Sequence, residues 1–274
     1  MFRSMGGAAF SSIFKATEFA PLSTPATIEV PTGANAIHVQ AAVGGGAAGV
    51  SGAEYDKSGG ESGGTGGGSG AYISDKIFTV SEGETLTFTV GEGGSTGQLG
   101  SYPNYYADDG DDTSLSGDST GSVFILSGGG GGSSSGGTTP NGSVRTNLPS
   151  SGGTATIDGS PITSGTFVEA NGAVSSISPS TPSLQQGIVG IFNQSGDGVA
   201  GTLGQNCSGD NCQIAGQPGG ASYDGNIPGG TGRFNSLGDA GTRGSGGGGG
   251  GAQPQSNGGV GGDGEIIYRF IKVL

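Results

Sequence analysis

The segment NYYADDGDDTSLSGD, residues 104–118, holds the densest set of side chains that could bind a ligand. Its residues Asp108, Asp109, Asp111 and Asp112 offer carboxylate oxygens, the ligand type that Ca²⁺ takes in proteins. Their spacing differs from that of an EF-hand loop, so the sequence favours a solvated acidic loop over a Ca²⁺ site. We expect no other cofactor and no other metal.

Three tyrosines, Tyr102, Tyr105 and Tyr106, lie beside these acidic residues. Tyrosine among small polar residues is typical of recognition loops, because it gives a large contact area at a low cost in entropy. We therefore predict that the three tyrosines and the four aspartates bind a receptor. The alternative is that the same loop only covers the domain or contacts neighbouring subunits.

Histidine and cysteine are two further residue types that could take part in catalysis or form a covalent bond. The single histidine, His38, alternates with Ile37 and Val39, so we expect it on the polar side of a strand, without an oriented partner for a catalytic triad. Cys207 and Cys212 lie in NCSGDNC, where a local disulfide and two free thiols are both compatible with the sequence. We expect no enzymatic activity.

The composition limits the classes of partner. Glycine provides 66 of the 274 residues, hydrophobic residues only 31%, and the net charge is −13 without any cluster of Lys or Arg. Binding to nucleic acid or to an anionic membrane requires a basic surface, so the composition argues against both. No apolar stretch is long enough to cross a membrane.

Several short stretches have the pattern of β-strands. ATIEVPTGANAIHVQAAV places Ile37, Val39, Ala41 and Val43 on one face, and DKIFTVSEGETLTFTVGEGG has the shape of a hairpin. SVFILS is typical of a buried strand. EIIYRFIKVL is apolar on both faces around Arg269, which predicts a central strand.

Between these stretches glycine recurs at every third position. Examples are Gly46 and Gly49, the series Gly64, Gly67 and Gly70, and the series Gly258, Gly261 and Gly264. Three residues per turn is the period of an extended left-handed helix without internal hydrogen bonds. Glycine at every third position would allow two such helices to approach and bond backbone to backbone. The glycine-rich stretches therefore predict packed helices, whose backbone bonds replace part of a hydrophobic core.

The order of these features resembles the glycine-rich domains of bacteriophage tail-fibre and adhesin proteins. The resemblance rests on IEVPTGANAIHVQAAV, GGGAAG, FTVSEGETLTFTVGEGG and the closing GGDGEIIYRFIKVL, and it covers residues 26 to 274 apart from the unmatched region 95–215. The TNF-like domain of some animal receptor kinases is similar in plan. The resemblance implies an all-β fold, an antiparallel β-sandwich of jelly-roll or TNF-like type with packed glycine-rich helices of polyproline II type.

The resemblance also implies a function and a location. We expect a virion component of the tail fibre or spike, which contacts other virion proteins and a host receptor, either a glycan or an outer-membrane protein. An oligomer is compatible with this role. A purely structural virion protein, such as a capsid decoration or fibre shaft, is an alternative that would use the same fold without a receptor. Two others are an ice-binding protein, which would also use glycine helices but with a flat, regular Thr-rich or Ala-rich face, and a receptor ectodomain fragment, which normally carries more cysteines and a signal peptide.

The N-terminal residues 1–22 stand outside the sandwich pattern, which we assign to residues 23–274 with Ser/Thr/Asp-rich insertions at 95–215. This arm is dense in apolar side chains: Phe2, Phe10, Phe14 and Phe19. An apolar arm usually docks on a partner. We predict that it attaches the protein to the virion or to neighbouring copies, with packing against its own domain as the alternative.

Overall fold

The fold is known from a computed structural model, which describes residues 16–51, 61–62, 64–95, 104–135, 150–161, 206–207, 217–220, 227–233, 237–249 and 257–273. Every regular element within these ranges is a β-strand. No helix in the described part of the chain is long and apolar enough to span a membrane. The strands form two large antiparallel sheets and two small ones, which confirms the prediction of an all-β fold that contains a sandwich.

The first large sheet, sheet A, has four strands. In spatial order they are β1 (Ala20–Leu22), β14 (Glu265–Ile271), β3 (Ala36–Val43) and β5 (Tyr72–Thr79). The C-terminal strand β14 is therefore an inner strand, as its apolar sequence predicts. Its alternate residues Ile266, Tyr268 and Phe270 are buried in the core between the sheets.

The second large sheet, sheet B, has six strands that follow one another in chain order. They are β2 (Ala26–Glu29), β6 (Thr85–Thr89), β8 (Thr113–Gly117), β9 (Gly121–Leu126), β11 (Ala155–Ile157) and β12 (Ser160–Pro161). A jelly roll consists of two Greek keys, in which a long connection brings a fourth strand back beside the first. The chain-ordered sheet B does not have that connectivity, so the jelly-roll detail of the prediction is wrong.

Two short ribbons complete the strands: β7 (Asn104–Tyr106) pairs with β10 (Ser133–Ser135), and β4 (Glu61–Ser62) pairs with β13 (Asn206–Cys207). The core between the large sheets is built from aliphatic and aromatic side chains of both. In its centre the rings of Phe88 on β6 and Tyr268 on β14 lie 4.9 Å apart.

Two local predictions are corrected by the strand pairing. The stretch around SEGE is not a hairpin, because β5 pairs with β3 in sheet A, whereas β6 pairs with β2 and β8 in sheet B. In β3, the partners in β14 pass from Tyr268 opposite Val39 to Ile267 opposite Ala41, so the register shifts at Gln40. As a result Ala42 joins the core cluster in place of Ala41.

Beyond the sandwich, extended glycine-rich segments lie side by side and form what we call the glycine bundle. Its central segment, residues 44–51, is buried throughout and donates its N–H groups to three neighbours in rotation. The donors 44, 47 and 50 bond to residues 71, 68 and 65, the donors 45 and 48 to 111 and 108, and the donors 46 and 49 to 262 and 259. The same partner thus recurs at every third residue, which is the period predicted from the glycine spacing.

The carbonyl groups of the central segment face three other neighbours. Those of residues 45, 46 and 47 accept hydrogen bonds from the N–H groups of Gly129, Gly94 and Gly247. The six surrounding segments are residues 64–71, 91–95, 107–112, 127–132, 244–249 and 257–264, and each bonds to the next around the ring. The central segment is therefore enclosed on all sides by backbone.

A second interior segment, residues 244–249, is enclosed in the same way. It bonds to segments 44–51, 64–71, 217–220, 227–233, 237–242 and 257–264, and all its residues are buried. An added Cβ at any of Gly246, Gly247, Gly248 and Gly249 would overlap a backbone carbonyl, which belongs to segment 64–71 for the first and last, to 257–264 for the second and to 227–233 for the third. A run of consecutive glycines is required here because no direction around the segment is free.

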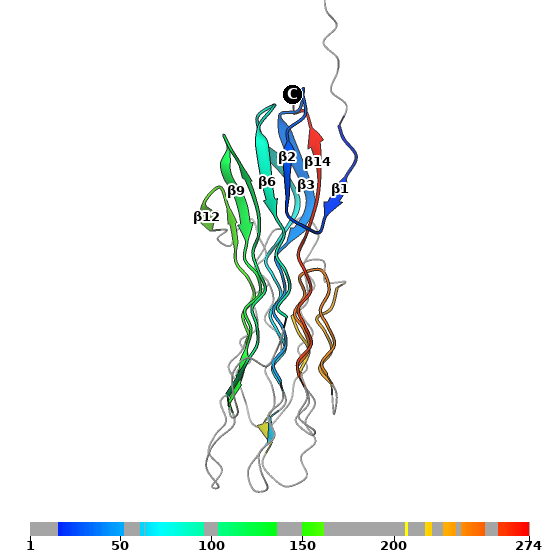
Figure 1. The fold of residues 1–274 in the computed structure, drawn as a ribbon, viewed down its shortest axis with the longest axis vertical. Helices are drawn as coiled ribbons and strands as arrows, with labels where there is room; N and C mark the ends of the chain where they lie inside the picture. The colour runs from blue at the N-terminus through cyan, green and yellow to red at the C-terminus, as the bar shows by residue number, and fades with distance from the viewer. Residues whose placement is uncertain are drawn as a thin grey trace, which may run out of the picture.

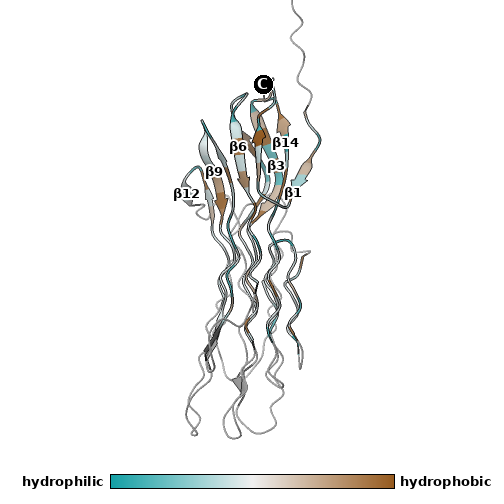
Figure 2. Ribbon diagram, viewed as in Figure 1, coloured by the Kyte–Doolittle hydropathy of each residue, from teal (hydrophilic) through white to brown (hydrophobic). Residues whose placement is uncertain are grey.

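The described part of the molecule is elongated. Figure 1 shows the sandwich at one end, the glycine bundle running away from it along the long axis, and the ribbons β7–β10 and β4–β13 toward the far end. Hydrophobic residues gather on the sandwich strands, as Figure 2 shows. The two parts are thus stabilised differently: the sandwich by apolar burial and the bundle mainly by backbone hydrogen bonds.

Candidate functional site

The acidic residues lie on residues 107–112, which connect β7 to β8 and form one of the six segments around the central segment. The carbonyl oxygens of Asp108 and Asp111 accept 2.9 Å hydrogen bonds from the N–H groups of Ala48 and Gly45. This stretch was expected to be a solvated loop. It is instead an extended element of the glycine bundle, held by its backbone, with its carboxylates toward the outside.

Most of these carboxylates accept hydrogen bonds from neighbouring backbone. Asp109 Oδ1 accepts from the N–H of Gly131 at 2.6 Å, and Asp112 Oδ1 accepts from the N–H of Gly128 at 3.1 Å. Asp108 Oδ2 accepts from the N–H and the hydroxyl of Ser95 at 3.1 and 2.8 Å. Among the described residues no backbone carbonyl accepts from these outward N–H groups, so the aspartate side chains satisfy them.

The arrangement gives little support for a cation site. No group of three or more His, Cys, Asp or Glu side chains is placed to hold a metal ion among the residues that the structure describes. Asp109 and Asp112 are three residues apart and both face segment 127–132, whose N–H groups occupy one oxygen of each.

The tyrosines are brought to the ribbon β7–β10. Tyr106 is half exposed, and its backbone pairs with Ser133, while Tyr105 pairs with Ser134. Tyr102 lies outside the described residues. The structure thus places two of the three tyrosines on one short ribbon toward the far end of the bundle, and their binding to a receptor stays a prediction.

One of the two cysteines and most of the predicted arm fall on parts of the chain that are not described. Cys207 belongs to β13, where its backbone pairs with Glu61, while Cys212 lies outside the described residues. The same holds for Phe2, Phe10 and Phe14 of the arm. Phe19 is described, and it lies against sheet A directly before β1, so the end of the arm packs on its own domain.

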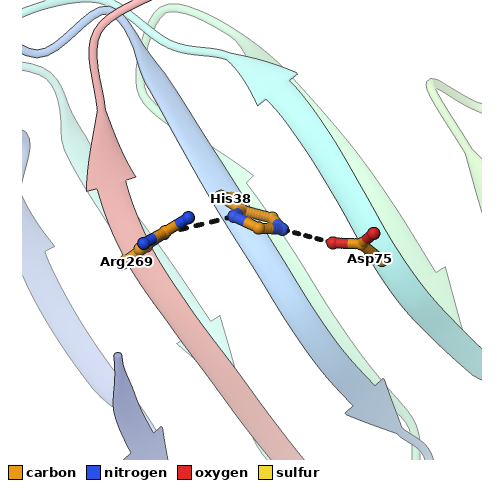
Figure 3. Close-up of polar contacts among 3 residues, drawn as sticks. All are labelled: His38, Asp75 and Arg269. Atoms are coloured by element: carbon orange, nitrogen blue, oxygen red, sulfur yellow. Dashed lines mark hydrogen bonds and ion pairs between the residues drawn. The ribbon is translucent and has the colours of Figure 1, made fainter. Parts of the chain in front are cut away.

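Phe19 contacts a row of polar side chains on the outer face of sheet A. Figure 3 shows His38 between Arg269 and Asp75, on three adjacent strands. Arg269 Nε donates to His38 Nδ1 at 3.2 Å, and His38 Nε2 lies 2.6 Å from Asp75 Oδ1. Because Nδ1 accepts from Arg269, the ring proton is on Nε2 and is donated to Asp75.

His38 was expected to have no oriented partner, and the structure differs from that expectation. Only 13% of its side chain is exposed, and both ring nitrogens are engaged. Asp75 adopts a positive φ of 53°, which turns the strand locally at this residue. The alternation of His38 with apolar residues was correctly interpreted as placing it on the outer face. Its partners lie on neighbouring strands of the sheet, but these strands are far from β3 in the sequence, so no local pattern indicates them.

The sequence analysis did not identify Glu84, which accepts more hydrogen bonds than any other carboxylate among the described residues. It is only 5% exposed, and it accepts hydrogen bonds from the N–H groups of Ser81, Ser119 and Thr120 and from the Thr120 hydroxyl. Burial raises the pKa of Glu84, but these bonds to Ser81, Thr120 and Ser119 together hold that pKa below its ordinary value. Glu84 thereby ties the turn before β6 to the turn between β8 and β9.

One of two comparisons with known proteins identifies the family of the chain. A search of curated proteins found no match to the chain. A family model described as a glycine-rich domain matches residues 21–271, which includes all of both large sheets except Ala20 and all described segments of the glycine bundle. The chain therefore belongs to the glycine-rich domain family.

Proposed function

We propose that this protein is a component of a bacteriophage tail fibre or spike, carried on the virion, and that it binds the host cell surface without catalysing a reaction. Its partners would be other virion structural proteins and a host receptor, either a glycan or an outer-membrane protein. The order of sequence features that resembles phage adhesins suggested this role, and one structural relationship supports it.

That relationship is the separation of the two ends of the molecule. Thr17, at the start of the described chain, bonds to Phe270 near the end of β14, so the predicted attachment arm leaves from the sandwich. The ribbon β7–β10, which carries Tyr105 and Tyr106, lies toward the opposite end of the glycine bundle (Figure 1). An adhesin needs this polarity, with one end joined to the particle and the other presented to the receptor.

In this proposal the glycine bundle is the shaft between the ends. We infer that its segments are left-handed helices of the polyproline II type, since bonding partners recur every third residue. At about 3.1 Å per residue, a segment the length of residues 44–51 would span roughly 25 Å. Two segments enclosed by backbone on all sides would resist bending, which suits a shaft that holds a binding surface away from the particle.

The test is adsorption of labelled particles to host cells. Replacing Tyr105 and Tyr106 together by Ala should lower adsorption, while particle assembly and thermal stability stay close to those of the parent protein. Thr87→Ala, on an exposed position of the sandwich, is the matched control and should adsorb normally. Unchanged adsorption of the tyrosine variant, or failure of assembly before adsorption is affected, would contradict the receptor-binding role.

A purely structural virion role is the second candidate, and the aspartates favour it. Asp109 and Asp112 were expected to face a receptor, but each accepts a hydrogen bond from a backbone N–H at the edge of the bundle. If particles that lack the protein adsorb normally yet lose mechanical or thermal stability, the protein acts as a decoration or shaft element.

A further inference from the structure

The N-terminal residues 17–22 complete the edge of sheet A. Thr17 donates its N–H to the carbonyl of Phe270 at 3.1 Å, and its hydroxyl accepts from the N–H of Phe270 at 2.9 Å. Further along, β1 pairs with β14 through Ala20 opposite Tyr268, Pro21 opposite Ile267 and Leu22 opposite Ile266. Without this strand, β14 would present an open edge, which readily pairs with another chain.

Phe19 holds the docked strand in place through its contacts with Arg269 and His38, which together with Asp75 we call the Phe19 seat. The guanidinium carbon of Arg269 lies 4.3 Å from the centre of the Phe19 ring, and the His38 ring meets the same ring edge-on at 5.3 Å. His38 holds Arg269 and is held in turn by Asp75 (Figure 3). All parts of this seat belong to β14, β3 and β5, so a second copy of the chain offers an identical seat.

The connection between β1 and the rest of the sandwich is short. Residues 23–25, Ser-Thr-Pro, are exposed and lead from β1 in sheet A to β2 in sheet B. Thr24 precedes Pro25, and a residue before proline favours an extended backbone. In this structure the chain bends at Ser23 and Thr24, which brings β1 onto its own sheet. An extended hinge would instead direct β1 away from it, and short hinge loops invite the exchange of identical segments between copies.

From the seat, the open edge and the hinge together, we propose that residues 16–22 exchange between two copies of this chain. Each copy's β1 pairs with the β14 of the other copy, and each Phe19 enters the Phe19 seat of the other copy. The exchange is reciprocal, so the two hinges are related by a two-fold axis. The exchange joins copies whether or not the protein binds a host.

Cross-linking between two differently marked chains tests the exchange. One full-length chain carries Pro21→Cys and the other Ile267→Cys, a pair that lies opposite in the β1–β14 register, and both carry Cys207→Ser and Cys212→Ser. The two chains are refolded together at several concentrations and oxidised. We expect a disulfide-linked heterodimer whose yield rises with concentration and falls several-fold when Phe19→Ala is added to the first chain.

Two controls give the result its meaning. Thr79→Cys in place of Pro21→Cys measures random collision, because β5 is not a neighbour of β14. Both cysteines in one chain measure docking within a copy. A heterodimer yield no higher than the collision control, with efficient cross-linking inside the double-cysteine chain, would overturn the exchange. Lengthening the hinge by four Gly-Ser residues should shift the double-cysteine chain from dimer to monomer, and an unchanged dimer fraction would also contradict the proposal.

Discussion

The N–H of Gly247 donates a 2.9 Å hydrogen bond to the carbonyl oxygen of Ala47, and this bond joins the two interior segments of the glycine bundle. Both residues belong to segments that are enclosed by backbone on every side. The contact between these two segments explains why the chain has consecutive glycines near its C-terminus. A Cβ at position 247 would overlap the carbonyl oxygen of Gly259, so the donor side of this bond requires glycine, whereas the acceptor Ala47 carries a side chain.

The first prediction concerns Gly247. A Cβ at this position would overlap the carbonyl oxygen of Gly259, so Gly247→Ala should lower the free energy of unfolding by about 3 kcal/mol or more. The control is Gly121→Ala, where a Cβ meets nothing within 4 Å and only the positive φ of 75° is unfavourable. Its cost should be about 1–2 kcal/mol. Equal losses for both variants in denaturant unfolding would contradict close packing at Gly247.

The second prediction concerns hydrogen exchange along residues 257–264. The N–H groups of Gly259, Gly261, Gly262 and Gly264 donate to other segments, whereas no backbone bond is made by those of Val260 and Asp263 within the described chain. Residues 260 and 263 are one helical turn of three residues apart and are both exposed. Amide exchange followed by NMR should therefore be slow at the four glycines and fast at the other two. Uniformly fast exchange would show that the bundle does not persist in solution.

The strands, the glycine spacing and the turns of this fold differ in how far the sequence could predict them. The alternation of Ile266, Tyr268 and Phe270 and the three-residue glycine spacing are local patterns, so both indicated the correct structure. The turn between β5 and β6 could not be distinguished from a hairpin turn, since the same residues suit a hairpin and a crossing between sheets. What differs is the partner of each strand, and the partner lies elsewhere in the chain.

The aspartates show the same limit at the candidate site. Asp112 and the N–H of Gly128 that it accepts from are 16 residues apart, and neither residue indicates the other. A cluster of carboxylates in sequence is equally consistent with a cation site, a receptor contact and a row of backbone acceptors. Only the register of segments 107–112 and 127–132 distinguishes these possibilities.

The third prediction separates the bonded aspartates from the unbonded one. Asp109→Ala with Asp112→Ala removes two acceptors of backbone N–H groups, and should speed exchange at Gly131 and Gly128 and lower the free energy of unfolding by about 1–2 kcal/mol. Asp111→Ala is the control, since no side-chain hydrogen bond of Asp111 occurs within the described residues and its carboxylate is exposed. A larger loss of stability for the control than for the double variant would show that the aspartates do not act as backbone acceptors.

The fourth prediction concerns Glu84 and acid. Its carboxylate accepts four hydrogen bonds between two turns, so Glu84→Gln should lower the free energy of unfolding at neutral pH by roughly 2 kcal/mol. The folded-state pKa of Glu84 lies below its ordinary value of 4.5. Its contribution is therefore complete above about that pH, and is lost as the pH falls through the lowered value.

Glu82→Gln is the matched control for this titration, because Glu82 lies in the same turn with its side chain exposed. Unfolding by urea at a series of pH values from neutral to strongly acidic would give the stability of each variant. The parent protein and Glu82→Gln should lose stability in parallel below pH 4.5, whereas Glu84→Gln should start lower and lose less, because it has no carboxylate to protonate at this position. If Glu84→Gln followed the same acid profile as the other two proteins, the carboxylate would not be what holds the turns before β6 and after β8 together.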